Sequence, residues 1–361
     1  MTLAVAVSGG VDSLCALLRL QEAGEDVCAL HARFLPDADG LSQSLAARLK
    51  DLALDVLTLD LRKSFRNDVL IPSLRSWHEG ATPNPCALCN RSLKFGLLLN
   101  EALKLGFSGL ATGHYARLER VHGQLLLGEA SDQSKDQSYF LSLIDRKALA
   151  KIRFPLSDMS KSACRSYLAS RGFLEESRKP ESQDVCFLPP RQELAAYLTR
   201  SWAELGLEEP KPGPLLLVNA KGQIDEHRRS HHGLWHYTEG QRRGLGVSGS
   251  EGFYVLKKDP KKNSLLIGPR SLLGMQALTA NQLNLFCPPE LWPKSLQVKV
   301  RYRQKPVPCK ATLVDDTLQI SFSEAQFPTA RGQLVSLATE QGYIVAGGVV
   351  KEMVLSADQW L

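Results

Sequence analysis

The residues best suited to chemistry stand near the start of the chain, in the segment Ser8-Gly9-Gly10-Val11-Asp12-Ser13. The two glycines permit a sharp turn that directs successive backbone N–H groups into one concavity. Asp12 and Ser13 are placed to cap the helix that follows, and a helix N-terminus beside such a turn is a phosphate site. The segment lacks the lysine of a P-loop and the third glycine of a dinucleotide-binding turn. It therefore predicts phosphate binding of another kind.

A second candidate is the pair Cys86 and Cys89, which follows two prolines in the segment 82–85. The prolines favour an extended approach, so both cysteines fall at the start of a helix that is predicted to run to Leu105. The positive end of a helix lowers the pKa of a thiol, which predicts thiolate at neutral pH. A lone Cys-x-x-Cys is compatible with a redox pair, half of a zinc site or chance. The chain holds no second Cys-x-x-Cys, which disfavours zinc.

The elements that must position these residues alternate between strands and helices over the first part of the chain. Apolar runs predict strands at 3–7, 26–30, 55–59 and 108–112, and helical spacing of apolar residues predicts helices over 41–52, 65–77 and 91–105. This alternation predicts a parallel, doubly wound α/β sheet, in which ligands bind beyond the carboxyl ends of the strands. The turn at 8–13 and the loop at Gly113-His114 should therefore lie close together.

The pattern changes beyond about residue 191. Before that point the sequence predicts a hairpin within 116–128 and an exposed loop at 175–180. Short strands dominate from about residue 276 to the end. We predict an α/β domain over 1–190, a small middle domain over 191–272 and a C-terminal antiparallel β-barrel over 273–361.

The composition limits the class of protein and the cellular compartment that the chain can belong to. The chain has 361 residues, of which 43% are hydrophobic, as in globular proteins of two or three domains. The absence of a long apolar run and of a leader segment predicts a cytoplasmic protein without a membrane partner. Eight cysteines are too few for a secreted disulfide scaffold of this length. The net charge of +6 is compatible with a polyanionic partner.

Several motifs occur together and in order, and together they resemble the bacterial tRNA-specific 2-thiouridylase family over essentially the whole chain. The string at 8–13 resembles the PP-loop of N-type ATP pyrophosphatases, which split ATP between its alpha and beta phosphates and place AMP on a substrate oxygen. The other motifs are TPNPxxxCNxxxKFG from Thr82, ATGHYAR from Ala111, KDQSYFL from Lys135, SQDVCF from Ser182, YTxGQRRGLG from Tyr237 and RYRQ from Arg301.

The resemblance implies a reaction in two parts. ATP, most simply with Mg²⁺, adenylates the 2-oxygen of the wobble uridine in tRNA, and sulfur then displaces AMP. Asp12 would hold the metal or orient ATP, Cys89 would be the nucleophile, and Cys186 would carry sulfur as a persulfide. The positions implied to bind ATP are Ala6, Val7, Ser8, Gly9, Gly10, Val11, Asp12, Ser13, Ala32 and Gly113, the last because glycine lets the nucleotide approach the backbone.

The resemblance also implies partners. The expected substrates are the tRNAs for Lys, Glu and Gln, the sulfur would come from a donor protein or sulfide, and a monomer is expected. The positions implied to contact tRNA are Asn84, Pro85, Cys86, His114, Lys135, Asp136, Gln137, Arg301, Tyr302 and Gln333.

The chain departs from the commonest family pattern at Cys86, where aspartate is usual. Cys86, Cys89 and Cys186 could therefore hold a 4Fe-4S cluster that leaves one iron open for hydrosulfide, and this hypothesis stands beside the persulfide route. Two further departures are Ala32, where a larger residue usually covers the adenine, and Glu239, which replaces an aliphatic residue in YTxGQR.

Two other interpretations remain. Another PP-loop tRNA-modifying enzyme, a 2-thiocytidine or lysidine synthase, would keep the ATP chemistry, but TPNPxxxCN and GQRRGLG argue against it. An RNA-binding module without catalysis would have no need to keep Asp12, Cys89 and Cys186.

Overall fold

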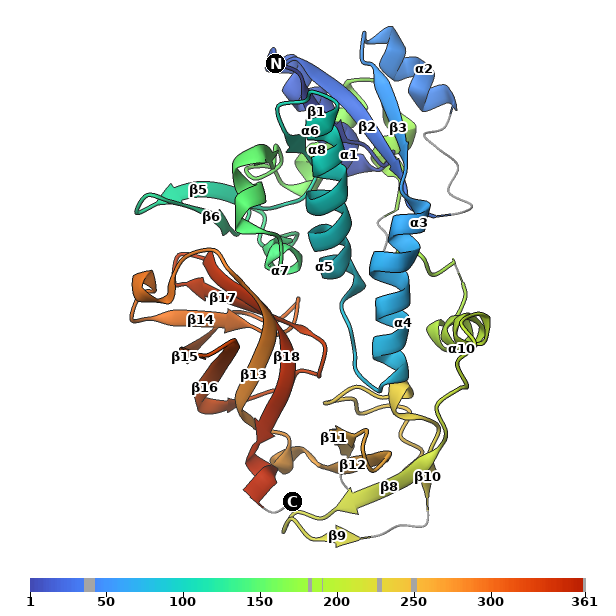
Figure 1. Cartoon of the computed structure of the whole chain (residues 1–361), viewed down its shortest axis with the longest axis vertical. Helices are drawn as coiled ribbons and strands as arrows, with labels where there is room; N and C mark the ends of the chain where they lie inside the picture. Colours follow the sequence, from blue (N-terminus) through green and yellow to red (C-terminus); the bar gives the residue numbers. More distant parts are fainter. Residues whose placement is uncertain (36–42, 181–183, 190, 226–228, 248–251, 360–361) are drawn as a thin grey trace.

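The computed structural model describes residues 1–35, 43–180, 184–189, 191–225, 229–247 and 252–359. Figure 1 shows an α/β unit at one end of the molecule and, at the other, a β-barrel beside a smaller β-rich middle unit. This is the predicted fold class. None of the helices in the described ranges is long and apolar enough to cross a membrane.

A parallel sheet of five strands forms the centre of the α/β unit, in the order β3-β2-β1-β4-β7. Because β1 and β4 are neighbours, the loops that follow them meet at one edge, as predicted. Helices pack on both faces of the sheet. The elements of this unit are β1 (Leu3–Ala6), α1 (Val11–Glu22), β2 (Val27–Arg33), α2 (Gln43–Asp51), β3 (Val56–Asp60), β4 (Leu110–Ala111), α7 (Ser138–Leu141), η3 (Arg146–Lys151), β7 (Ile152–Arg153), α8 (Lys161–Ser170) and α9 (Leu174–Arg178).

The stretch 175–180 is mostly helix α9, so the prediction of an exposed loop is wrong. Glu176 and Ser177 are buried there. Arg48 on α2 pairs with Glu176 at 3.2 Å, which offsets the cost of burying this carboxylate.

Two long helices descend from the sheet, and each contains a π-helical stretch (Figure 1). One consists of α3 (Arg62–Phe65), η1 (Arg66–Leu70) and α4 (Ile71–His78), and the other of α5 (Pro85–Cys89), η2 (Asn90–Leu98) and α6 (Leu99–Lys104). In the second, a Cβ at Gly96 would lie 2.8 Å from the carbonyl oxygen of Arg91, so only glycine fits this wide turn. π-helical stretches recur at functional sites, and this one directly follows Cys89.

The hairpin of β5 (Arg117–Val121) and β6 (Gln124–Gly128) forms as predicted, but it joins the barrel instead of the α/β sheet. Tyr343 and Ile344 of the barrel pair with β6. The six barrel strands follow the order β13-β16-β15-β14-β17-β18, and β13 pairs with β18 to close the ring. They are β13 (Met275–Leu285), β14 (Leu296–Lys299), β15 (Val307–Val314), β16 (Thr317–Gln326), β17 (Leu334–Thr339) and β18 (Tyr343–Leu355), with short helices η6 (Pro289–Leu291) and η7 (Ser356–Gln359).

The middle unit follows helix α10 (Leu194–Glu204), which packs on α4. The indole N–H of Trp202 donates to the carbonyl of Leu74 at 2.9 Å and ties the two helices together. The remaining elements of this unit are β8 (Gly213–Val218), β9 (Ile224–Asp225), β10 (Ser230–His231), η4 (Leu234–His236), β11 (Phe253–Asp259), β12 (Ser264–Pro269) and η5 (Arg270–Leu272).

Candidate active site

The glycine turn between β1 and α1 leaves the start of the helix open. Gly9 has a φ of 79°, in the left-handed region that glycine adopts without strain, and Gly10 is the N-cap. None of the described side chains caps α1, so the predicted capping by Asp12 and Ser13 is wrong. Ser13 Oγ instead donates to the carbonyl of Gly10 at 3.1 Å and accepts from the N–H of Ser8 at 3.2 Å. The first N–H groups of α1 therefore remain available to an anion.

Two lysines that the motifs did not single out lie against this turn. Lys161, at the start of α8, contacts both carboxylate oxygens of Asp12 at 2.7 and 2.8 Å. The hydroxyl of Tyr115 donates to the same carboxylate at 2.9 Å. Lys179 Nζ donates to the carbonyl of Gly9 at 2.9 Å. Two cations and a helix N-terminus thus converge on the glycine turn, a combination suited to a polyphosphate.

A cavity of about 240 Å³ lies beside the turn, at the carboxyl edge of the sheet. It brings together seven of the positions implied to bind ATP and two of those implied to contact tRNA, His114 and Gln137. Gly9, Gly10 and Val11 belong to the turn itself and are not among the described lining residues. The lining residues are Ala6, Val7, Ser8, Asp12, Ser13, Leu30, Ala32, Phe34, Lys94, Leu98, Thr112, Gly113, His114 and Gln137.

Gly113 has a packing role that the sequence did not suggest. A Cβ at this position would lie 2.5 Å from the carbonyl carbon of Asp12 and 2.6 Å from the N–H nitrogen of Ser13. The loop after β4 therefore rests directly on the backbone of the first turn of α1. Glycine is required here by the contact between the two loops, whereas the resemblance implied an approach by the nucleotide.

His114 is a buried, neutral base in the cavity wall. Burial lowers its pKa well below the usual value, and the nearby ammonium of Lys94 lowers the pKa further. Lys94 Nζ lies 3.5 Å from Nε2, and Thr112 Oγ1 lies 2.8 Å from Nδ1. Because an ammonium only donates, Nε2 accepts from Lys94 and Nδ1–H donates to Thr112. Lys94 is the lysine of KFG at the end of the motif that begins at Thr82. Membership of this motif was the feature of the sequence that could have indicated Lys94 as a site residue.

The three candidate cysteines lie near one another at the start of the second long helix. Asn84 is the N-cap of α5, and its side-chain oxygen accepts from the N–H of Ala87 at 3.1 Å, with Pro85 in the first turn. Cys86 and Cys186 are exposed, whereas Cys89 is buried. Cys86 and Cys186 both raise the pKa of Cys89, Cys86 also raises the pKa of Cys186, and Lys94 lowers the pKa of all three thiols. Ser182 and Gln183 of the SQDVCF motif lie outside the described residues.

The prediction of a thiolate at neutral pH is wrong for Cys89. Burial raises the pKa of this thiol to about 11, and the opposing effect of Lys94 only partly offsets that rise. Burial in the surrounding protein also raises the pKa values of Cys86 and Cys186, although both residues keep exposed surface. Desolvation thus outweighs the attraction of Lys94 for the thiolate, and Cys89 is a neutral thiol at pH 7.

Alkylation of Cys89 should therefore depend steeply on pH. Only the thiolate reacts, so the rate with iodoacetamide should rise about tenfold per pH unit above neutrality and level off near the pKa of about 11. Lys94→Met should slow the reaction at every pH below that value, because it removes the cation that favours the thiolate. Lys104→Met, on exposed helix surface, is the matched control. Peptide mass spectrometry gives the rates, and a flat pH profile would contradict this assignment.

Several positions implied to contact tRNA have partners inside the chain. Asp136 is buried and accepts from the N–H groups of Ala130 and Ser138. Arg301 donates to the carbonyl of Glu239 at 2.8 Å, and Gln333 donates to the carbonyl of Thr82 at 3.0 Å.

The aromatic ring of Tyr302 lies 4.5 Å from that of Phe140, and Gln137 accepts from the N–H of Tyr115 at 3.1 Å. Lys135 lies in the loop before Asp136. Direct contacts of all these residues with tRNA remain predictions.

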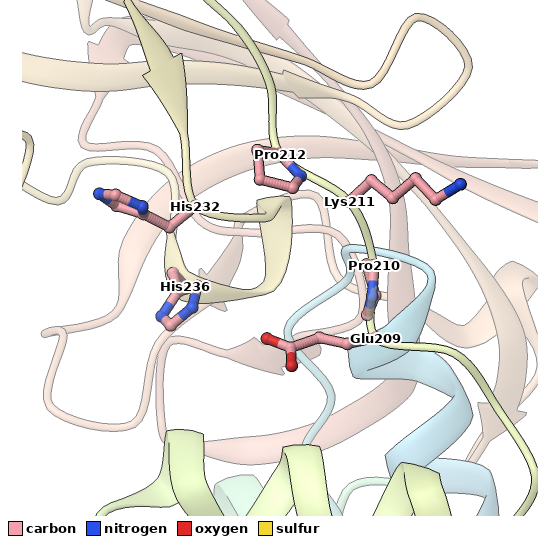
Figure 2. Close-up of a pocket in the computed structure, with 6 residues that line it drawn as sticks. All are labelled: Glu209, Pro210, Lys211, Pro212, His232 and His236. Carbon is pink, nitrogen blue, oxygen red and sulfur yellow. The ribbon is translucent and has the colours of Figure 1, made fainter.

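The predicted three-cysteine ligand set is not assembled in the structure. Across the described residues, no group of three histidine, cysteine, aspartate or glutamate side chains is placed to hold a metal ion. A wider hollow of about 470 Å³ lies in the middle unit. Its residues His232 and His236 have a spacing found in metal sites, but the described residues there do not form a group of three metal ligands either. Figure 2 shows Glu209 pointing toward His236 there, while Lys211 points away. This hollow lacks the glycine turn and the thiols.

Three family models match successive parts of the chain. The model of the tRNA methyl transferase HUP domain matches residues 1–190, that of the tRNA methyl transferase PRC-barrel domain matches 209–269, and that of the aminomethyltransferase beta-barrel domain matches 275–350. Among solved structures, a 4-thiouridine synthetase in complex with RNA and ATP is 17% identical, with a TM-score of 0.35 over 57% of this chain and 51% of that chain.

Curated relatives match over nearly their whole length. A tRNA-specific 2-thiouridylase MnmA from Nitratidesulfovibrio vulgaris is 42% identical over 97% of this chain and 99% of its own. The enzyme of the same name from Treponema denticola is 34% identical over 98% of both chains. The chain therefore belongs to the tRNA-specific 2-thiouridylase family of enzymes.

Proposed function

We propose that the chain activates the 2-oxygen of the wobble uridine of tRNA with ATP and replaces that oxygen with sulfur. One observation carries this proposal. Lys94 lines the cavity beside the glycine turn, and its charge also acts on Cys86, Cys89 and Cys186. A phosphate-binding turn and a group of thiols thus flank the same side chain.

In the first step the uridine 2-oxygen attacks the alpha phosphorus of ATP, and the bond to the beta phosphate breaks. The open N-terminus of α1, with Lys161 and Lys179 beside it, would hold the departing pyrophosphate. Of the described residues that line the cavity, only Asp12 carries a carboxylate, so it would hold the Mg²⁺ that accompanies ATP. When bound, Mg²⁺ neutralises phosphate charge. Asp12 would have to exchange its contact with Lys161 for the ion.

In the second step the terminal sulfur of a Cys186 persulfide attacks C2 of the uridine, and the bond from C2 to the oxygen of AMP breaks. Cys89, once deprotonated, attacks the Cys186 sulfur and releases the thiocarbonyl, which leaves a Cys89–Cys186 disulfide. A cellular thiol reductant must then reduce that disulfide. The raised pKa of Cys89 keeps its thiol protonated until a base takes the proton.

A 4Fe-4S cluster on Cys86, Cys89 and Cys186 remains an alternative source of sulfur. The thiols are close enough to influence one another, but they are not arranged as a ligand set in the described structure. We therefore derive no step through a cluster. A donor protein would pass the outer sulfur of its own persulfide to the Cys186 thiolate and leave as a thiol, whereas sulfide would attack the Cys89–Cys186 disulfide at Cys186 and release Cys89 as a thiolate. This sulfur donor and the choice among tRNAs for Lys, Glu and Gln stay part of this proposal. So does the division into domains 1–190, 191–272 and 273–361, which the matched family models support.

Analysis of tRNA nucleosides tests the proposed function. The purified protein, incubated anaerobically with unmodified tRNA, ATP and a small-molecule persulfide as the sulfur donor, should form 2-thiouridine and release pyrophosphate only when tRNA is present. Asp12→Asn should lower pyrophosphate release about a hundredfold or more, because it removes the one carboxylate among the described residues that line the cavity. Formation of 2-thiocytidine or lysidine would instead show a different acceptor base, and the absence of pyrophosphate release would exclude adenylation.

A further inference from the structure

The three units of the molecule meet at an ion pair between Glu239 and Lys258. Both residues belong to the middle unit, and their side chains are only 4% and 2% exposed. Lys258 Nζ lies 3.6 Å from Glu239 Oε2, and this oxygen has no hydrogen-bond partner among the described residues. A buried pair with an unsatisfied oxygen is a poor source of stability, because desolvation consumes most of the attraction. The presence of this buried pair therefore needs an explanation other than a contribution to stability.

Lys258 reaches out of its own unit. Its ammonium donates to the carbonyl of Tyr237 at 2.8 Å and to Thr82 Oγ1 at 3.3 Å. Thr82 belongs to the connector between α4 and α5 of the α/β unit. Glu239 thus holds the ammonium in place while the ammonium holds Thr82.

The barrel also forms hydrogen bonds with the connector that contains Thr82. The N–H of Thr82 donates to the carbonyl of Arg331 at 2.8 Å, and the carbonyl of Thr82 accepts from Gln333 at 3.0 Å. The backbone N–H, the carbonyl and the hydroxyl of Thr82 are therefore all engaged by other units. Arg301 of the barrel also binds the middle unit directly, because it donates to the carbonyl of Glu239 at 2.8 Å.

The connector leads directly to the candidate thiols. Thr82 stands two positions before Asn84, the N-cap of α5, and the same short helix carries Cys86 and Cys89. Pro83 on one side of Asn84 and the proline that begins α5 on the other restrict the backbone between them. A displacement of Thr82 would therefore move the start of α5 by nearly the same distance.

We propose that Lys258, held by Glu239, is a positioning residue that fixes Thr82 and thereby sets the place of Cys89 relative to the nucleotide cavity. Lys258 touches neither substrate nor thiol, and it acts only through the connector. Its effect on catalysis rests on the proposed function, whereas its effect on the placement of Cys89 does not.

Three variants test this inference. Thr82→Val removes only the hydroxyl that receives Lys258 and keeps the ion pair, and Lys258→Met removes the donor. Lys257→Met is the matched control, since this neighbouring lysine is about half exposed and pairs with Asp358 at 3.0 Å. In the tRNA-free protein, both test variants should alkylate Cys89 at least about fivefold faster than the wild type, while the control should not. In turnover, both should lower kcat for thiolation about tenfold and leave KM for ATP unchanged.

The double variant Thr82→Val with Lys258→Met should be no slower than Lys258→Met alone, because Lys258→Met already removes the contact that Thr82→Val breaks. Additive losses, or unchanged alkylation of Cys89 in Thr82→Val, would overturn the proposal. If Lys258→Met fails to fold, Thr82→Val still decides, because it leaves no buried charge unpaired. If the wild type forms no 2-thiouridine, the proposed function fails, while the alkylation rates still test the positioning role.

Discussion

Cys89→Ala and Cys186→Ala should each lower the yield of 2-thiouridine by at least about a thousandfold, because each removes a sulfur that the transfer step requires. Release of pyrophosphate from ATP in the presence of tRNA should continue in both variants. The glycine turn, Lys161 and Lys179 do not depend on these thiols. Nucleoside analysis and a pyrophosphate assay on the same samples would separate the two steps.

The third cysteine distinguishes the two sources of sulfur. Under the persulfide route, Cys86→Ala should lower thiolation only a few-fold, and anaerobically purified protein should contain neither iron nor acid-labile sulfide. Under the cluster route, Cys86→Ala should abolish thiolation, and iron should be present. Cys309→Ala, in the barrel, is the matched control and should behave as the wild type. Near-normal thiolation by Cys89→Ala or Cys186→Ala would refute both routes.

Gly113→Ala should disable the nucleotide site. The added Cβ would overlap the backbone of Asp12 and Ser13, at 2.5 and 2.6 Å, so the first turn of α1 must move. Backbone offers no flexible end that could give way, and overpacking of this kind costs about 1–3 kcal/mol of unfolding free energy. We expect the affinity for ATP, measured by calorimetry, to fall at least about tenfold.

A second glycine provides the control for Gly113→Ala. Gly123, in the turn of the β5–β6 hairpin, has a φ of 78° and open space around a Cβ. Gly123→Ala should cost about 1 kcal/mol of stability through backbone strain and leave the affinity for ATP unchanged. Equal ATP affinity in wild type and Gly113→Ala would show that the contact between the two loops does not shape the site.

The parts of the fold that depend on local pattern could be predicted from the sequence. The apolar run 3–7 and the helical spacing after it predict β1 and α1 without reference to the rest of the chain, and alternation then implies the parallel sheet. The glycine turn and the loop at Gly113 follow, because the carboxyl ends of parallel strands share one edge.

Features that depend on distant partners could not be predicted in this way. The pKa of Cys89 is raised by burial in a cluster to which α3, α4 and α10 contribute aromatic and aliphatic side chains, and this effect exceeds that of Lys94. Lys161 meets Asp12 only because α8 returns beside α1. The ion pair of Glu239 and Lys258 likewise requires the middle unit to be folded before the two residues meet.

The pairing of β6 with β18 has a consequence for biosynthesis. The β5–β6 hairpin is translated long before Tyr343 and Ile344, the residues of β18 that pair with β6. During translation the edge of β6 therefore remains unpaired, and its free backbone groups can bind other nascent chains or chaperones. Co-translational folding of the α/β unit can begin before the barrel is made, but β6 gains its partner only after β18 has been synthesised.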